Sequence, residues 1–384
     1  MEDKKMTKAG IYIHIPFCTF KCIYCDYYSI EKREKDMPRF VEMLIREIKL
    51  TANKYEEDWT FDTIFFGGGT PSLLEPQWIE KILYTLNRFF NISMETEITL
   101  EANPGEAPKM RLVEFRKLGI NRLSLGFQSL QPKLLTKLSR IHGPNDCFST
   151  YQDAREAGFE NINVDMLFNI PNQSPEVFED DLKQVAKLSP EHISAYSLTV
   201  EKNTPFHTKV MNGEMTMPSE EIDLDMFEFC RKYLTSHGYS QYEISSYTQD
   251  GMECLHNLHY WNMEPYLAFG PSAHGYDGYI RWWNASSLNT YMQILDNNER
   301  PIIGSESLTR EDHFNEAVFN GLRTMKGIQI GKINSWKDEI NNMNSAIQKW
   351  KNRLDITKDS ISLKSDSYKY ADEIALDMMQ IGTK

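Results

Sequence analysis

The sequence predicts an α/β fold in which strand–helix units repeat and a small helical domain follows. Apolar strand segments alternate with amphipathic helices six times between Gly10 and Tyr196. Beyond Pro301 the pattern changes to amphipathic helices, the second of them with Trp336 and Trp350, and one short hairpin. Apolar strands that alternate with helices form a parallel sheet with crossover helices. Such a sheet is either an incomplete (β/α) barrel or a doubly wound sheet, and periodicity alone does not separate the two.

Each expected strand is a short apolar segment that ends at glycine or at polar residues. The strands are expected at Gly10–Ile15, Thr63–Phe66, Glu97–Leu100, Arg122–Leu125, Asn161–Met166 and His192–Tyr196. The helices between them are marked by capping residues, by proline in the first turn and by glycine after the last. They are expected to start at Asp36 and at Pro76, and to cover residues 109–118, 134–138, 146–157 and 174–188.

Length and composition limit the class of protein. The 384 residues allow two or three domains, or one barrel with an appendage. A net charge of −13 disfavours nucleic-acid binding, which needs a basic surface. No apolar segment is long enough for a signal peptide or a membrane span. Six cysteines without a disulfide framework indicate a reducing compartment, so we expect a soluble, cytoplasmic protein.

Glycine and polar residues follow the strand ends, which favours the barrel. They are the cysteine loop at residues 18–25, Gly67–Ser72, Glu101–Gly105, Gly126–Ser129 and Asp165. In a parallel barrel the loops after the strands meet at one rim and build the active site. Each segment also has a structural interpretation: the glycines make a tight turn, and the carboxylates cap or stabilise loops. The functional alternatives are close backbone approach to a ligand and hydrogen bonds to a ribose diol.

Three cysteines, Cys18, Cys22 and Cys25, lie in the loop after the first strand. Three thiolates hold three corners of a cubane iron–sulfur cluster and leave the fourth iron open to a small ligand. A structural zinc site is the alternative, but it normally closes four ligands with paired Cys-x₂₋₄-Cys units. Only Cys22 and Cys25 form such a unit, so the spacing favours the cluster.

The cysteine spacing, followed by Gly67-Gly68-Gly69-Thr70-Pro71, resembles the radical SAM superfamily. Longer words, among them Tyr12–Cys18 and Leu123–Ser129, resemble the group formed by oxygen-independent coproporphyrinogen III oxidases and haem chaperones of the HemW type. The resemblance implies a partial (β/α)6 radical SAM barrel with a small C-terminal helical, winged-helix-like domain. It implies a 4Fe-4S cluster on the three cysteines and an S-adenosylmethionine (SAM) pocket lined by Tyr12, Tyr24, Gly68, Gly69, Thr70, Glu101, Gln128, Arg140, Asp165 and Ala195.

Three features favour the haem chaperones over the oxidases. Tyr27 stands at the position where the oxidases carry a further cysteine. Only 17 residues precede Cys18, whereas the oxidases carry a long N-terminal extension. The segment from Cys254 to Trp261 matches a His-Asn-x-x-Tyr-Trp word that is associated with haem in the chaperone branch. A neutral imidazole is a common axial haem ligand, so His256 is the candidate. The alternative is a satisfied core histidine.

Two other features of this region are weaker. His274 is a further possible ligand or a structural residue, and the aromatic run Tyr279–Trp283 covers a flat ligand or belongs to the core. Cys254 belongs to no Cys-x-x-Cys-His word, so covalent haem attachment is not indicated.

We expect a radical SAM barrel at residues 1–250, a connecting segment at 251–300 and a C-terminal domain at 301–384. The expected function is to bind haem and pass it to acceptor proteins. The alternatives are oxidative decarboxylation of coproporphyrinogen III, and a radical SAM methyltransferase or haem-degrading enzyme. The winged-helix pattern does not indicate DNA binding, because the chain is acidic and no basic recognition helix is present. The sequence indicates neither the haem acceptor nor the oligomeric state.

Overall fold

The computed structural model describes residues 6–52, 59–333 and 337–379. Its main feature is a twelve-stranded sheet in the order β12-β11-β10-β9-β1-β2-β3-β4-β5-β6-β8-β7. Strands β1 to β6 are parallel neighbours in chain order. Their bounds are Thr7–Ile15, Trp59–Gly68, Ile92–Ala102, Arg122–Gln128, Ile162–Phe168 and His192–Ser197.

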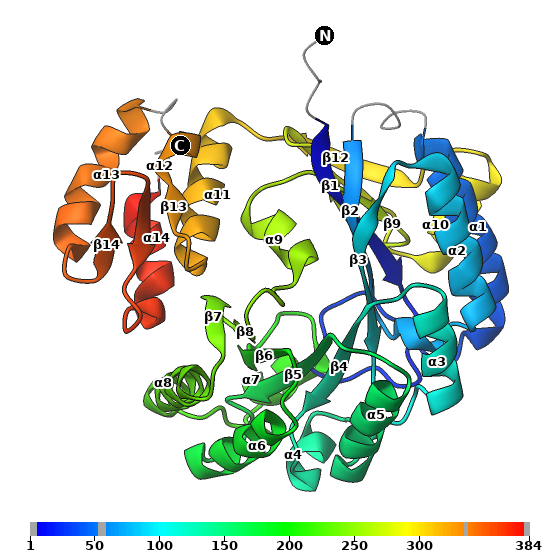
Figure 1. Ribbon diagram of the computed structural model, residues 1–384, viewed down its shortest axis with the longest axis horizontal. Helices are drawn as coiled ribbons and strands as arrows, with labels where there is room; N and C mark the ends of the chain where they lie inside the picture. Colours follow the sequence, from blue (N-terminus) through cyan, green and yellow to red (C-terminus); the bar gives the residue numbers. More distant parts are fainter. Residues whose placement is uncertain (1–5, 53–58, 334–336, 380–384) are drawn as a thin grey trace.

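This strand order is that of a barrel. A doubly wound sheet reverses its order at a switch point, whereas β1 to β6 follow one another without reversal. Figure 1 shows the sheet curving, with the crossover helices on its convex side. These helices are α1 (Met37–Ala52), α2 (Pro76–Phe89), α3 (Lys109–Lys117), α4 (Pro132–Lys137), α5 (Pro144–Glu156) and α6 (Pro175–Lys187). The predicted α/β partial barrel is confirmed.

The convex side of the sheet carries the main hydrophobic core. In β1, Ile11, Ile13 and Ile15 are fully buried against the helices. The alternate residues Gly10, Tyr12 and His14 face the concave side, because successive side chains of a strand point to opposite faces. The sequence therefore places apolar residues under the helices and polar or small residues inside the barrel.

Antiparallel strands extend both edges of the parallel sheet. At the β6 edge lie β8 (Ser246–Thr248) and β7 (Ser240–Glu243), after helices α7 (Pro205–Met211) and α8 (Glu220–Ser236). At the β1 edge lie β9 (Tyr266–Phe269), β10 (His274–Tyr276), β11 (Ile280–Asn284) and β12 (Ile302–Ser307), with α10 (Leu288–Asp296) before β12. The segment expected to connect two domains, residues 251–300, thus contributes three strands, β9 to β11, to the sheet.

Helix α9 (Leu255–Trp261) lies inside the curve of the sheet, between the parallel strands and the C-terminal unit (Figure 1). Its first turn is held by Glu97 of β3, whose carboxylate accepts hydrogen bonds from the backbone N–H groups of Leu255 and His256, both at 3.2 Å. The negative charge suits the helix N-terminus. The helix therefore fills the barrel on its concave side.

The C-terminal unit has its own core and a three-stranded sheet in the order β13-β15-β14. Thr309 and Asp312 form a capping box before α11. The elements of the C-terminal unit are α11 (Arg310–Arg323), β13 (Ile328–Gln329), α12 (Ile330–Ile333), α13 (Lys337–Trp350), β14 (Leu354–Ile356), β15 (Ser360–Leu363) and α14 (Ala371–Met378). Trp336, expected in the second helix, lies outside the described residues. Within the described part of the chain, no helix has the length and apolarity needed to cross a membrane.

Candidate functional site

The cysteine loop leaves β1 and returns to it as a closed loop. The N–H of Cys18 donates to the carbonyl of Ile30 at 3.0 Å, and the N–H of Ile30 donates to the carbonyl of Pro16 at 2.7 Å. All three cysteines of the loop are free thiols of intermediate exposure. Burial raises the pKa of each of them, to about 11 for Cys25. Metal binding must therefore displace protons from these thiols.

The three thiols of one loop are the candidate ligands of the cluster. Within the described residues, no three thiol, imidazole or carboxylate groups converge closely enough to hold one metal ion. In an iron–sulfur cubane each thiolate binds a different iron, so the ligand sulfurs need not converge on a single point. The loop is thus compatible with a cluster.

The glycine segment after β2 packs directly on the cysteine loop. The N–H of Gly69 donates to the carbonyl of Ile15, and that of Thr70 to the carbonyl of Phe17, both at 2.7 Å. A Cβ atom on Gly69 would lie 2.6 Å from the Phe17 oxygen, so no larger residue fits here. The Thr70 hydroxyl also donates to the sulfur of Cys18 at 3.7 Å. The glycines therefore allow the strand tip and the cysteine loop to form one unit.

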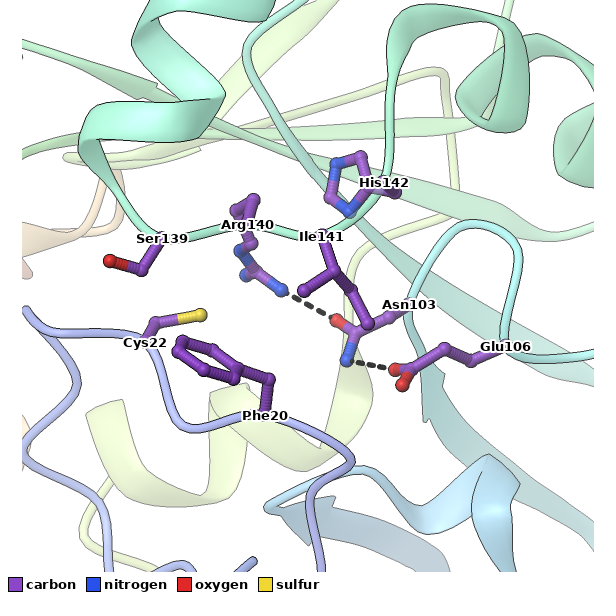
Figure 2. A pocket seen from close by; sticks show the side chains of 8 residues that line it. All are labelled: Phe20, Cys22, Asn103, Glu106, Ser139, Arg140, Ile141 and His142. Atoms are coloured by element: carbon purple, nitrogen blue, oxygen red, sulfur yellow. Dashed lines mark hydrogen bonds between the residues drawn. The ribbon is translucent and has the colours of Figure 1, made fainter.

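A hydrogen-bonded chain of side chains joins the cysteine loop to the next strands, and Figure 2 shows its part from Arg140 through Asn103 to Glu106. Arg140 donates to Asn103 Oδ1 at 2.7 Å and to the hydroxyl of Tyr24 at 3.0 Å. Asn103 Nδ2 donates to Thr70 Oγ1 at 2.9 Å and to Glu106 Oε2 at 2.6 Å. These residues surround a small pocket beside Cys22; its lining is Phe20, Cys22, Asn103, Glu106, Ser139, Arg140, Ile141 and His142. The buried Arg140 Nε has no hydrogen-bond partner, so the guanidinium has capacity for an anionic ligand.

Two carboxylates lie deeper in the barrel mouth. Glu101 accepts a hydrogen bond from the N–H of Gly68 at 3.2 Å, and burial together with Asp165 raises the pKa of Glu101 to about 8. Asp165 accepts hydrogen bonds at 2.8 Å from Ser124 and Asn163, while burial raises its pKa. The pair is suited to a ligand that brings positive charge and hydroxyl groups.

Three further predicted residues also lie on these strands. Gln128 is buried at the end of β4 with a φ of 66°, and its amide nitrogen lies against Gly126. Ala195 on β6 is buried, and its N–H donates to the carbonyl of Ser245 at 2.8 Å. Tyr12 lies on β1, where its hydroxyl is 3.0 Å from His14 Nδ1.

His256 is 1% exposed and has partners at both ring nitrogens. Nδ1 is 2.8 Å from the hydroxyl of Thr63 and Nε2 is 2.8 Å from the hydroxyl of Tyr260. Its ring stacks on Phe65 at 5.2 Å between centroids and on Tyr12 at 6.4 Å. The structure therefore places His256 in the packing between α9 and the sheet.

Comparisons with known proteins agree with this geometry. Residues 12–185 match the Radical SAM superfamily. The chain is 36% identical over 318 residues to the heme chaperone HemW of Bacillus subtilis (strain 168), covering 83% of this chain and 84% of the relative. It is 37% identical to the heme chaperone HemW of Escherichia coli (strain K12) over 272 residues, 71% of each chain. The chain belongs to the HemW family of radical SAM proteins.

A solved structure supports the architecture of this HemW family member. Coproporphyrinogen III oxidase (HemN) from Escherichia coli, described as a radical SAM enzyme, matches with a TM-score of 0.86 at 22% identity. The match covers 98% of this chain and 91% of that chain. At this identity the likeness shows the fold alone.

Membership of the HemW family implies a 4Fe-4S cluster and SAM, and the residues present fit both groups. The three thiols share one loop, Arg140 lines the pocket beside Cys22, and Glu101 and Asp165 interact on the neighbouring strands. A bound cluster supplies an electron to SAM in this superfamily. The contribution of the chain itself is to fix the loop, the glycine segment and the two carboxylates relative to one another.

Sequence reasoning missed the residues that hold this site together. Asn103 bridges Thr70, Glu106 and Arg140, although it was visible in the run directly after the third strand. His14 Nε2 is 2.7 Å from the carbonyl of Tyr28, so it donates to the end of the cysteine loop. Burial lowers the pKa of His14 to about 4, and the ring is therefore neutral. Nothing local in the sequence predicts the Tyr28 contact.

Proposed function

We propose that this protein is a cytoplasmic haem chaperone that binds haem and passes it to acceptor proteins. The observation that carries the proposal is its relationship, over most of both chains, to proteins named heme chaperone HemW. The structure supports it through a cysteine loop and a polar barrel mouth in the positions that a radical SAM protein requires.

The proposal includes the ligands of the two cofactors. Cys18, Cys22 and Cys25 hold the cluster. Arg140 and the adjoining Tyr24 hydroxyl are suited to the carboxylate of SAM, because a guanidinium binds carboxylates in a planar geometry. Glu101 is suited to its ammonium group and Asp165 to its ribose hydroxyls. The remaining residues of the proposed SAM pocket are Tyr12, Gly68, Gly69, Thr70, Gln128 and Ala195.

The second candidate is the oxygen-independent coproporphyrinogen III oxidase reaction, which the fold similarity to HemN favours. In that case the barrel mouth would take a porphyrinogen as substrate. Tyr27 is 64% exposed beside the cysteine loop. It stands at the position where the oxidases carry a cysteine. This departure favours the chaperone.

One experiment separates the two functions. Tag-free protein, reconstituted anaerobically with iron and sulfide, is titrated with ferric haem and, in a parallel sample, incubated with SAM, a reductant and coproporphyrinogen III. We expect saturable haem binding with a Soret shift and no protoporphyrinogen. Protoporphyrinogen formed over several turnovers would establish the oxidase, and the absence of saturable haem binding would refute the chaperone.

A further inference from the structure

Haem iron needs an imidazole nitrogen that is unprotonated, free of other bonds and open to approach. The chain has nine histidines, and all nine lie in the described residues. Five of them are buried and have a ring nitrogen in a hydrogen bond; they are His14, His142, His192, His256 and His259. His237 is exposed and bonds through Nδ1 to the carbonyl of Tyr233, which leaves Nε2 open, but it follows α8, which packs beside α6 on the convex side of the sheet. The three whose ring nitrogens make no hydrogen bond within the described chain are His207, His274 and His313.

His256 is the residue that the His-Asn-x-x-Tyr-Trp word indicates, but its position is unfavourable for coordination. To bind iron, His256 must break its hydrogen bond to the hydroxyl of Thr63 or to that of Tyr260. That hydroxyl then lacks this hydrogen-bond partner in or beside the core. A buried polar group left without a hydrogen-bond partner is unfavourable. The ring must also leave its stack on Phe65.

His274 has the opposite environment. It is exposed on β10, and its ring stacks on Trp283 with the centroids 6.0 Å apart and the planes 27° apart. Trp283 in turn lies flat on Gly304, where a Cβ atom would come within 2.4 Å of the indole. The orientation of the imidazole is thus fixed by ring packing, and both of its nitrogens stay free. Partial burial and the nearby Arg281 lower the pKa of His274, which favours the neutral ring.

The strand register places His274 on the concave face of the sheet. Tyr12 of β1 is opposite Ala268 of β9, Tyr266 of β9 is opposite Tyr276 of β10, and His274 is two residues from Tyr276. Residues two apart on a strand share a face. The half-buried Tyr266 and Trp283 therefore lie on the same face as His274, on the side of the barrel mouth, and the buried Tyr276 packs against Tyr266. Such an aromatic face suits the apolar face of a porphyrin.

We propose that His274, rather than His256, is the imidazole that coordinates haem iron in this protein. The inference rests on the proposed function, since it names the contact through which the cargo is held. Coordination adds a bond between an imidazole nitrogen of His274 and the iron and requires no oxidant or reductant.

The other two free imidazoles are less well placed. His313 on α11 makes an edge contact with Tyr279, at 6.3 Å and 78°. His207 lies half-buried on α7 and makes no aromatic ring contact within the described chain. Neither imidazole stacks on an aromatic ring as His274 does on Trp283. His207 therefore serves as a matched control, because its removal deletes an unbonded imidazole elsewhere on the barrel.

The test is a titration of tag-free protein with ferric haem, followed by absorbance and electron paramagnetic resonance. His274→Ala should weaken binding at least about tenfold, equivalent to about 1.4 kcal/mol. It should also change the Soret band and the ferric resonance. Added imidazole should restore the wild-type spectrum, which a purely structural role for His274 would not produce. His207→Ala and His256→Gln should retain the wild-type spectrum.

The outcomes separate the inference from the proposed function. Wild-type protein that binds no haem refutes the function and the inference together. Haem binding that is unchanged in His274→Ala, or lost without rescue by imidazole, overturns only the assignment of His274. Loss of the spectrum in His256→Gln with an unchanged His274→Ala spectrum would return the ligand to His256.

Discussion

Replacing His256 by Ala tests whether the His-Asn-x-x-Tyr-Trp word has a structural role. The imidazole joins the Thr63 and Tyr260 hydroxyls, both at 2.8 Å, and stacks on Phe65. Its removal leaves the fully buried Thr63 hydroxyl without a partner and opens a cavity between α9 and the sheet. An unsatisfied buried group costs about 1–3 kcal/mol, and truncation of a large buried ring costs about 3–5 kcal/mol.

We therefore expect His256→Ala to lower the free energy of unfolding by about 3–5 kcal/mol. This is a large part of the about 5–15 kcal/mol that a folded domain has. Urea denaturation followed by circular dichroism measures the loss. His256→Gln keeps a hydrogen-bonding group at the site and should lose less. Burial lowers the pKa of His256 well below its usual value, so at low pH the unfolded chain takes up a proton that the native ring does not. The loss caused by His256→Ala should therefore be about 1 kcal/mol smaller at pH 5.5 than at pH 8.

His207→Ala is the control for this prediction, since that ring makes no hydrogen bond within the described chain. It should change stability by about 0.5 kcal/mol or less. A loss below about 1 kcal/mol in His256→Ala would refute the reasoning, because it would mean that the imidazole is not an essential part of the packing around α9.

Three further predictions concern the cluster, SAM and a buried carboxyl. Cys22→Ala should abolish the broad absorbance of the cluster after anaerobic reconstitution; unchanged iron and sulfide content would contradict the ligand assignment. SAM affinity, measured by calorimetry, should rise from pH 6 to about pH 7.5, where the ammonium group of SAM still keeps its proton, as Glu101, whose pKa is about 8, becomes a carboxylate. Glu101→Gln should lose this dependence; equal slopes would exclude Glu101. Glu47 lies in the α1 core, where burial raises its pKa to about 7 although Tyr291 and Asn284 donate to it. The native carboxyl of Glu47 therefore keeps a proton that the unfolded chain releases. For this reason the free energy of unfolding should fall by up to about 3 kcal/mol between pH 4.5 and pH 7.5. Glu47→Gln should remove that part of the pH dependence.

Much of the barrel could be predicted because its signals are local. Each parallel strand is an apolar run followed by a glycine or polar turn, and the observed β1 to β6 contain the cores of the predicted strands. The same signals placed the cysteine loop, the glycine segment and Glu101 at one rim. The strands were longer than predicted, since their ends carry the polar residues that face the barrel interior.

The β1 edge of the sheet could not be predicted in the same way. Strands β9, β10 and β11 have only three to five residues each, which is too short for an alternating pattern to stand out. Their place beside β1 depends on pairing across more than 250 residues, as between Gly10 and Tyr266. The position of His274 on the concave face follows from that pairing and from nothing in its neighbourhood in the sequence.

The His-Asn-x-x-Tyr-Trp motif from His256 to Trp261 locates a structural element more reliably than it assigns a chemical role to each residue. Each aromatic or imidazole side chain in it has a packing partner: His256 has Thr63, His259 has Asp62 at 2.7 Å, and Trp261 lies 5.7 Å from the guanidinium of Arg323 in α11. These contacts join the barrel, α9 and the C-terminal unit. A residue pattern can therefore be required for haem binding because it builds the scaffold, while the ligand itself lies elsewhere. In this chain the exposed imidazole with free nitrogens is on β10, on an aromatic face that the scaffold holds beside the barrel mouth.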